Sequence, residues 1–242
     1  ETDKTACEAL AEKARIIYEQ YPESEDIALL YARILFNLST EQTELKERKV
    51  TAEKLEKLQQ QFQDSPDIAL RYVRILFNLS TEQTELKEIE ATAEKLEKLQ
   101  QQFQNSPDIA LQYAMILVNL STKQTELKEL ETTAEKLEKL QQQFQDSPDI
   151  ASKYAMILVN LSTIQTELKE RKATVEKLEK LQQKFPKSEE IAFIYSVFLA
   201  SLFDYQTEVD ERLQTTKIIK KLYEQFSNFM LQNFDDLFFS ND

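Results

Sequence analysis

Two arginines and a row of asparagines are the side chains whose type and spacing best suit the binding of another molecule. Arg33 and Arg74 lie 41 residues apart, and a guanidinium group binds a carboxylate through two parallel hydrogen bonds. Asparagines recur with the same step, and each amide can donate and accept hydrogen bonds: Asn37, Asn78, Asn119 and Asn160. These residue types favour recognition over covalent chemistry.

The composition removes most kinds of catalytic site. The 242 residues include no Gly and no His, which excludes glycine-rich phosphate loops, dinucleotide fingerprints, nucleophile elbows and the usual general base. Cys7 has no second Cys and no His with which to bind a metal. Carboxylates are abundant, but they recur on similar polar faces, where no pair has divergent environments. We therefore expect a protein that is not an enzyme and has no catalytic residue, cofactor or metal.

Net charge and hydropathy limit the partners. The chain holds 43 Asp and Glu against 30 Lys and Arg, a formal net charge of −13 at pH 7, which repels nucleic acid and anionic lipid. Its most apolar stretch, residues 191–203, is shorter than the roughly 20 residues of a membrane-spanning helix. With a lone cysteine and no signal peptide in view, we expect a cytoplasmic protein that binds neither nucleic acid nor membrane.

An internal repeat of 41 residues dominates the sequence, marked by Phe62, Phe103, Phe144 and Phe185. A constant step in this range is typical of helical solenoids. Within the second full copy, one apolar stripe predicts a first helix over 66–80, and another predicts a second helix over 84–103. Ser65 and Pro66 suit the N-cap and the first position of that first helix.

The repeat predicts an all-α protein of about twelve helices. We expect one elongated solenoid over 1–242, because neither helix of a pair can bury its stripe alone. It comprises a leading half-repeat at 3–21, five helix pairs over 25–226 and a C-terminal capping helix at 228–239. The chain begins on the second helix of a pair, from which we expect the natural protein to extend further toward its N-terminus.

The closing segment is rich in aromatic side chains that need cover from water. Phe229, Phe234 and Phe238 lie within it, and we expect them to close the last repeat. A dimer contact, or a docking site for a partner helix, is the alternative.

The first helices resemble those of tetratricopeptide repeats. Each places a large–small pair and then a large residue at the family's spacing: Ala28, Tyr31-Ala32 and Leu35; Ala110, Tyr113-Ala114 and Leu117; Ala151, Tyr154-Ala155 and Leu158. The family's proline after the second helix matches Pro22 and Pro186. The period is longer than the family's 34 residues, and the small position never holds Gly. HEAT or armadillo arrays, with periods of about 40 to 47 residues, are the alternative.

The resemblance implies that the variable face of the first helices lines a concave groove that binds the ligand. The implied partner-binding residues are Leu29, Arg33, Phe36, Asn37, Leu70, Arg74, Phe77, Asn78, Met115, Asn119, Met156 and Asn160, with Arg71 and Lys153 as flanking cations. In a chain of net negative charge, cations gathered on one face indicate that an acidic or C-terminal carboxylate group is held there.

Two structural interpretations compete with this binding face. Arg33 and Arg74 could instead pair with Asp26, Asp67 or glutamates of the second helices. The asparagines form a peptide-binding ladder in armadillo-type arrays, but they could instead satisfy the free carbonyls at the ends of their own helices, where no glycine is present.

We expect an interaction module that binds a protein or peptide segment in the groove without covalent chemistry. The alternative is a structural spacer or sensor arm of a larger multidomain protein, with an empty groove. The two differ in their tolerance to loss of one whole 41-residue unit, which a spacer should accept.

Overall fold

The computed structural model describes residues 2–203, 205–227, 229 and 230, and these residues form eleven α-helices and no strand. The expected all-α repeat is confirmed, and the number of helices is close to the predicted twelve. In chain order the helices are α1 (Thr2–Gln20), α2 (Glu25–Glu41), α3 (Leu45–Gln61), α4 (Pro66–Ser80), α5 (Leu86–Gln102), α6 (Pro107–Ser121), α7 (Leu127–Gln143), α8 (Pro148–Ile164), α9 (Leu168–Lys184), α10 (Glu189–Phe203) and α11 (Val209–Gln225).

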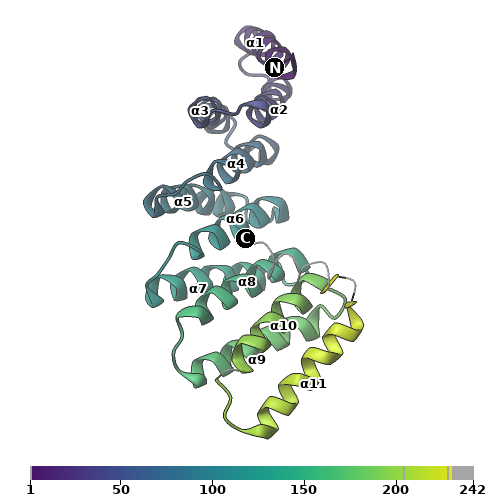
Figure 1. Cartoon of the computed structure of the whole chain (residues 1–242). Coiled ribbons are helices and arrows are strands. Elements are labelled where there is room, and N and C mark those ends of the chain that lie inside the picture. The colour runs from purple at the N-terminus through teal and green to yellow at the C-terminus, as the bar shows by residue number, and fades with distance from the viewer. Residues whose placement is uncertain (1, 204, 228, 231–242) are drawn as a thin grey trace. The chain divides into compact units, whose positions relative to one another are not determined.

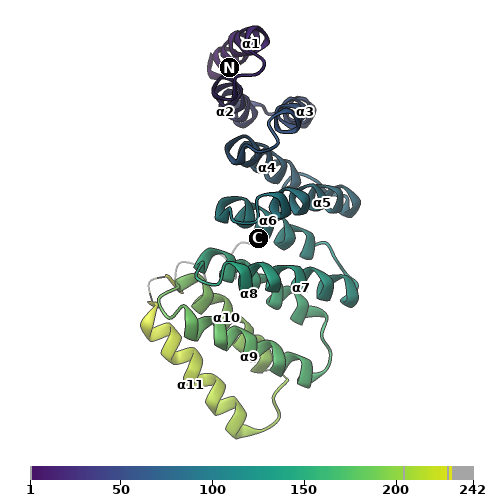
Figure 2. The ribbon, with the colours of Figure 1, turned by 180° about the vertical axis from the view of Figure 1, so that it is seen from behind.

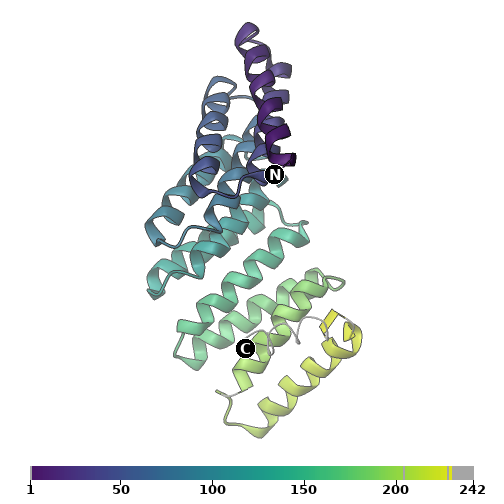
Figure 3. The same cartoon turned by 45° about the horizontal axis from the view of Figure 1, so that its top comes forward.

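The chain forms two compact units, unit 1 (Glu1–Leu120) and unit 2 (Ser121–Asp242), and each is described by itself. In unit 1 the first helices α2 and α4 pack side by side. The second helix α3 packs against both of them, and the second helix α5 packs against α4 (Figures 1 and 2). In unit 2, α8 packs against α7, α9 and α10, and the yellow α11 lies beside α10 (Figure 3). A single continuous solenoid over 1–242 stays a prediction.

A serine starts each first helix. Ser65 is the N-cap of α4 and Pro66 is its first residue, as predicted. In the other copies the serine hydroxyl accepts a hydrogen bond from the backbone N–H three residues on, at Ser24, Ser106, Ser147 and Ser188. The second helix α5 begins at Leu86, two residues later than predicted, because its N-cap Glu85 has an extended backbone with φ −83° and ψ 125°.

The helices end without left-handed residues, since no described residue has a positive φ. The caps are extended, as at Gln42 after α2, or intermediate, as at Phe62 after α3. Side-chain hydroxyls donate hydrogen bonds to carbonyls three residues earlier near the ends of the first helices. Ser39 donates to the Phe36 carbonyl at 2.6 Å and Thr40 to the Asn37 carbonyl at 2.7 Å, and Ser80, Thr81, Ser162 and Thr163 repeat these bonds.

The constant row of the first helices forms the core. Ile68, Tyr72 and Ile75 of α4 are at most 3% exposed. Burial of each such side chain stabilises the fold by about 1.5–3 kcal/mol. The corresponding side chains of α6 and α8 are equally buried, whereas Ile27 and Ile34 of α2 are only partly buried. No helix in the described part of the chain is long and apolar enough to cross a bilayer.

A glutamine–threonine pair joins the two helices of every copy. Thr51 Oγ1 donates to Gln42 Oε1 at 2.9 Å, and both side chains are buried. The same bond recurs at Gln83–Thr92, Gln124–Thr133, Gln165–Thr174 and Gln206–Thr215. An unsatisfied buried polar group costs about 1–3 kcal/mol, so this pair fixes how the second helix folds back on the first.

Candidate binding site

The residues predicted to bind a partner all lie on the first helices, at positions that are partly or fully exposed. Not one of them is fully buried. Unit 1 holds Leu29, Arg33, Phe36 and Asn37 on α2, Leu70, Arg74, Phe77 and Asn78 on α4, and Met115 and Asn119 on α6; unit 2 holds Met156 and Asn160 on α8. The accessible surface of these first helices in unit 1 is named the first-helix face below.

Three arginines of the first-helix face form a cluster, named the arginine cluster: exposed Arg33 on α2, and half-buried Arg71 and Arg74 on α4. Burial lowers the pKa of Arg71, and the positive charges of Arg74 and Arg33 lower it further. The three guanidinium groups therefore lie within electrostatic reach of one another across two helices.

The arginine cluster has no anionic partner within the described residues. None of its three side chains forms a salt bridge or a hydrogen bond there, and the Arg71 Nε atom is buried without an acceptor. Pairing of Arg33 and Arg74 with Asp26 or Asp67, the structural alternative, is therefore not seen. Asp67 acts on Arg71 only through its field, which raises the pKa of Arg71 in part.

The flanking cation of unit 2 is different, because it is already paired. Lys153 Nζ lies 2.9 Å from Glu190 Oε1 and 4.0 Å from the sulfur of Met156. In unit 1 the Nε2 atom of Gln112 similarly lies 3.9 Å from the sulfur of Met115. Free cationic charge on the predicted face is thus concentrated at the arginine cluster.

Two of the four asparagines donate hydrogen bonds to the preceding copy. Asn119 Nδ2 donates to the hydroxyl of Ser80 at 3.3 Å, and Asn160 Nδ2 donates to that of Ser121 at 2.8 Å. Two asparagines of the predicted ladder therefore join successive first helices.

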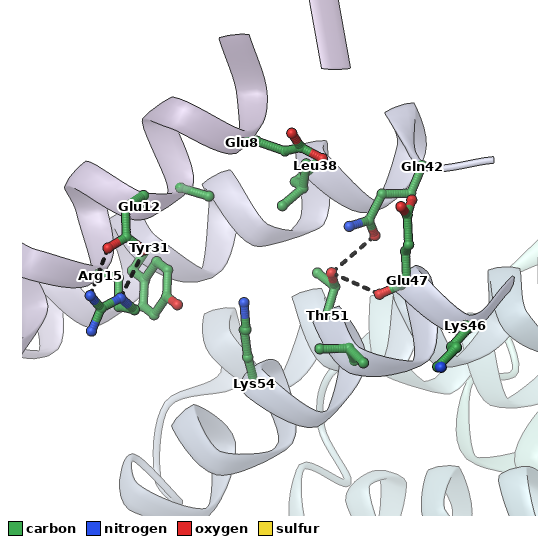
Figure 4. Close-up of a pocket in the computed structure, with 12 residues that line it drawn as sticks. Glu8, Glu12, Arg15, Tyr31, Leu38, Gln42, Lys46, Glu47, Thr51 and Lys54 are labelled. Carbon is green, nitrogen blue, oxygen red and sulfur yellow. Dashed lines mark hydrogen bonds and ion pairs between the residues drawn. The ribbon is translucent and has the colours of Figure 1, made fainter. Parts of the chain in front are cut away.

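A similar groove, which the sequence analysis missed, lies on the opposite side of three of the helix pairs. It lies between two successive second helices, and its floor is the tyrosine of the first helix between them. The groove between α1 and α3 has a volume of about 370 Å³ and is floored by Tyr31 (Figure 4). Those over Tyr72 in unit 1 and over Tyr195 in unit 2 measure about 290 Å³ and 420 Å³.

A lysine crosses the groove in the interior copies. Lys95 Nζ lies 2.8 Å from Glu56 Oε1 and 3.3 Å from the Tyr72 hydroxyl. Burial raises the pKa of Tyr72, and a hydrogen bond to Glu56 raises it further. The sequence signal was present, since the glutamate, tyrosine and lysine all recur at 41 residues, but these helix faces look like plain solvated surface.

At the N-terminal groove the lysine position is kept and the glutamate is replaced. Arg15 stands where the interior copies have Glu, and it bonds to Glu12 of its own helix (Figure 4). It also bonds to Glu19 of that helix. Lys54 lines the same groove. No group of three or more potential metal-ligating side chains gathers here or elsewhere in the described residues.

The predicted closing helix is described only at its start. Phe229 packs edge-on against Phe193 of α10, with ring centroids 6.1 Å apart, and Met230 is fully buried beside Ser196. Phe234 and Phe238 lie outside the described residues.

No family model and no curated protein match this chain. Among solved structures, a chain from "Computational Design of Self-Assembling Cyclic Protein Homooligomers" is similar over 97% of this chain and 94% of its own, with 13% identity and a TM-score of 0.22. A TM-score this low carries no statement about fold or function. The class of the protein rests on its own architecture, an all-helical protein of repeated helix–turn–helix pairs.

Proposed function

We propose that the protein is a non-catalytic interaction module, tetratricopeptide-like in architecture, whose first-helix face binds an acidic segment of a protein partner. The observation that carries this proposal is the arginine cluster. Arg33 and Arg74 both repel Arg71, and none of the three has an anionic partner among the described residues. In a chain of net charge −13, such a cluster is costly unless an anion from outside offsets it.

Apolar side chains beside the cluster give the partner segment a second kind of contact. Leu29, Phe36, Leu70 and Phe77 are each half-buried on the same face. A carboxylate held by guanidinium groups next to half-exposed apolar side chains suits a peptide better than a small anion. The tetratricopeptide-like spacing of the first helices supports the same face, because that family binds its ligands there.

The test is site-specific photo-crosslinking with the full chain in an extract of native cells. A benzoylphenylalanine replaces Phe77, and the crosslinked peptides are identified by mass spectrometry. We expect a protein segment rich in Asp and Glu or ending in a carboxylate. Reversal of two charges, in the double variant Arg33→Glu/Arg74→Glu, should reduce the crosslink by about tenfold or more, because the removed bonds are charge-assisted.

The matched control is the double variant Lys57→Glu/Lys98→Glu. It makes the same change in net charge in unit 1, at exposed positions of α3 and α5. Its crosslink should equal that of the unchanged protein. Equal loss in both double variants, or no loss in the arginine variant, would contradict binding at the cluster.

The structural spacer remains the second candidate, and one observation favours it. The glutamine–threonine pair repeats in all five copies, and a spacer needs such fixed helix geometry. The same crosslinking separates the two candidates. If the protein is a spacer, benzoylphenylalanine at position 77 should capture no more protein than benzoylphenylalanine in place of Lys98, an exposed residue of α5.

A further inference from the structure

Three side chains recur together in the grooves between second helices: a glutamate, a tyrosine and a lysine. Glu56, Tyr72 and Lys95 form the set in unit 1, as described above. In unit 2 the corresponding set is Glu138 of α7, Tyr154 of α8 and Lys177 of α9, all 82 residues further on. The ammonium lies 3.0 Å from the glutamate and 3.2 Å from the tyrosine hydroxyl.

The interior copies thus show how this arrangement holds an ammonium ion. One carboxylate oxygen and one phenol oxygen accept its hydrogen bonds. The Lys177 nitrogen lies beyond the Tyr154 hydroxyl, 5.9 Å from the ring centroid.

The last groove, between α9 and α11, keeps the acceptors and lacks the cation. Glu179 and Tyr195 hold the glutamate and tyrosine positions, but the lysine position is occupied by Ile218. Tyr195 is 3% exposed and forms the floor with Leu199 and Leu202. No described residue donates a hydrogen bond to the Tyr195 hydroxyl.

Charge around this groove is unbalanced in the direction that favours a cation. Glu176, Glu179, Asp210 and Glu211 line it, and Lys172 is the one cation among its lining residues. Lys172 Nζ lies 2.6 Å from Glu211 Oε1, so that carboxylate is already paired. Among the described residues, Glu179 accepts a single hydrogen bond, a neutral one from Gln183 Nε2 at 3.2 Å.

We propose that the groove between α9 and α11 binds a lysine side chain of a protein partner. Its ammonium sits between Glu179 and the Tyr195 hydroxyl, where the interior copies place their own lysine. Its methylene stem contacts Ile218 and Val175, which line the groove. This site lies in unit 2, between two second helices, so it stands independently of the arginine cluster.

The test uses Nα-acetyl-lysine methylamide as the probe and the full chain as the receptor. Nuclear magnetic resonance follows the Tyr195 ring and the Ile218 methyl groups during titration. We expect saturable shifts at both residues, and none with the norleucine analogue, which has no ammonium. Glu179→Gln should weaken binding by about tenfold or more, because a charge-assisted bond becomes a neutral one.

A second variant, Ile218→Lys, keeps the test independent of any damage to folding. It supplies the interior lysine, so it should abolish probe binding while the melting temperature stays the same or rises. Unchanged probe binding in this variant or in Glu179→Gln overturns the proposal, as do equal shifts with norleucine. Methylammonium that binds as tightly as the lysine derivative overturns the assignment to a lysine side chain.

Discussion

The two sides of each helix pair treat their cations differently. On the second-helix side, lysines bond to acids of the neighbouring second helix: Lys49 to Glu88, Lys95 to Glu56, Lys177 to Glu138 and Lys172 to Glu211. On the first-helix face of unit 1, the arginine cluster has no such acid among the described residues. The four arginines elsewhere all have partners within the chain: Arg15, Arg48, Arg171 and Arg212.

This difference separates the charges that bond to a neighbouring copy from those that have no opposite charge beside them in the described structure. Glutamate and lysine recur together in the interior copies, where each lysine bonds to the glutamate of the neighbouring second helix. At the last groove Ile218 stands in the lysine position, and Arg33, Arg71 and Arg74 have no bonded acid among the described residues. Both proposed sites are therefore places where a repeated structure has a charge without its opposite.

The largest loss of stability should come from breaking the buried glutamine–threonine pair that joins the two helices of each copy. Thr51→Val in unit 1 and Thr215→Val in unit 2 each leave a buried glutamine amide without its partner. We expect each to lower the free energy of unfolding by about 1–3 kcal/mol, measured by chemical denaturation. Similar losses in both units would show that the glutamine–threonine pair has the same role in both. The two sides of a helix pair would then differ only in how their charges are paired. A loss in one unit only would contradict this.

A smaller effect, confined to alkaline pH, separates the last groove from the interior ones. Burial and the charge of Glu179 raise the pKa of Tyr195 to about 12, from an ordinary value of 10.0. Between these values the unfolded tyrosine has lost its proton and the folded one has kept it. Stability from this group is therefore complete below pH 10 and is lost as pH rises toward 12.

The measurement is tyrosinate absorbance combined with denaturation on either side of pH 10. Tyr72 and Tyr154, which have raised pKa values through burial and their glutamates, should titrate later than Tyr195. Tyr195→Phe should reduce the loss of stability between pH 10 and pH 12. An unchanged loss in this variant would show that Tyr195 is not the group responsible.

The sequence was sufficient for features that depend on neighbouring residues along the chain. The start of α4 at Pro66 and the apolar row of Ile68, Tyr72 and Ile75 follow from capping and helical period, and the structure has both. The choice of the first helices for the candidate binding face also came from the sequence, because the Arg33 row varies between otherwise similar copies.

Contacts between copies could not be read in the same way, since they depend on how the helices stack. Lys95 reaches Glu56, 39 residues earlier, although Glu94 and Lys98 stand at the favourable spacing within one helix. The amide of Asn119 likewise reaches Ser80 in the preceding copy. Such partners lie almost one repeat apart, so helix-surface spacing along the chain does not indicate them.

A further variant gives an interior copy the residue that the last copy has at the lysine position. Lys177→Ile introduces the residue of the last copy and removes the bond to Glu138. Both side chains of this pair are partly exposed, at 44% and 33%, so we expect a loss of at most about 1 kcal/mol. The loss should shrink in high salt. Denaturation at two salt concentrations checks this, and a loss independent of salt would contradict an electrostatic role.

The smallest effect has the opposite sign and lies on the first-helix face. Arg71→Gln introduces the residue that stands one repeat later, at Gln112. It relieves burial of a charge and repulsion from Arg74 and Arg33, so stability should stay the same or rise by about 0.5 kcal/mol. Thermal denaturation measures it. A clear loss of stability would reveal an internal partner for Arg71 and would remove the main support for the binding face.

The binding role of the arginine cluster is tested most directly by nuclear magnetic resonance of the arginine Nε–H groups during titration with acetate. We predict saturable shifts for Arg33, Arg71 and Arg74, largest for the unbonded Nε of Arg71, and small shifts for Arg15 and Arg212, which already have partners. Sodium chloride at equal ionic strength should not reproduce the shifts. Equal shifts at all arginines, or none at the cluster, would contradict a carboxylate-binding face.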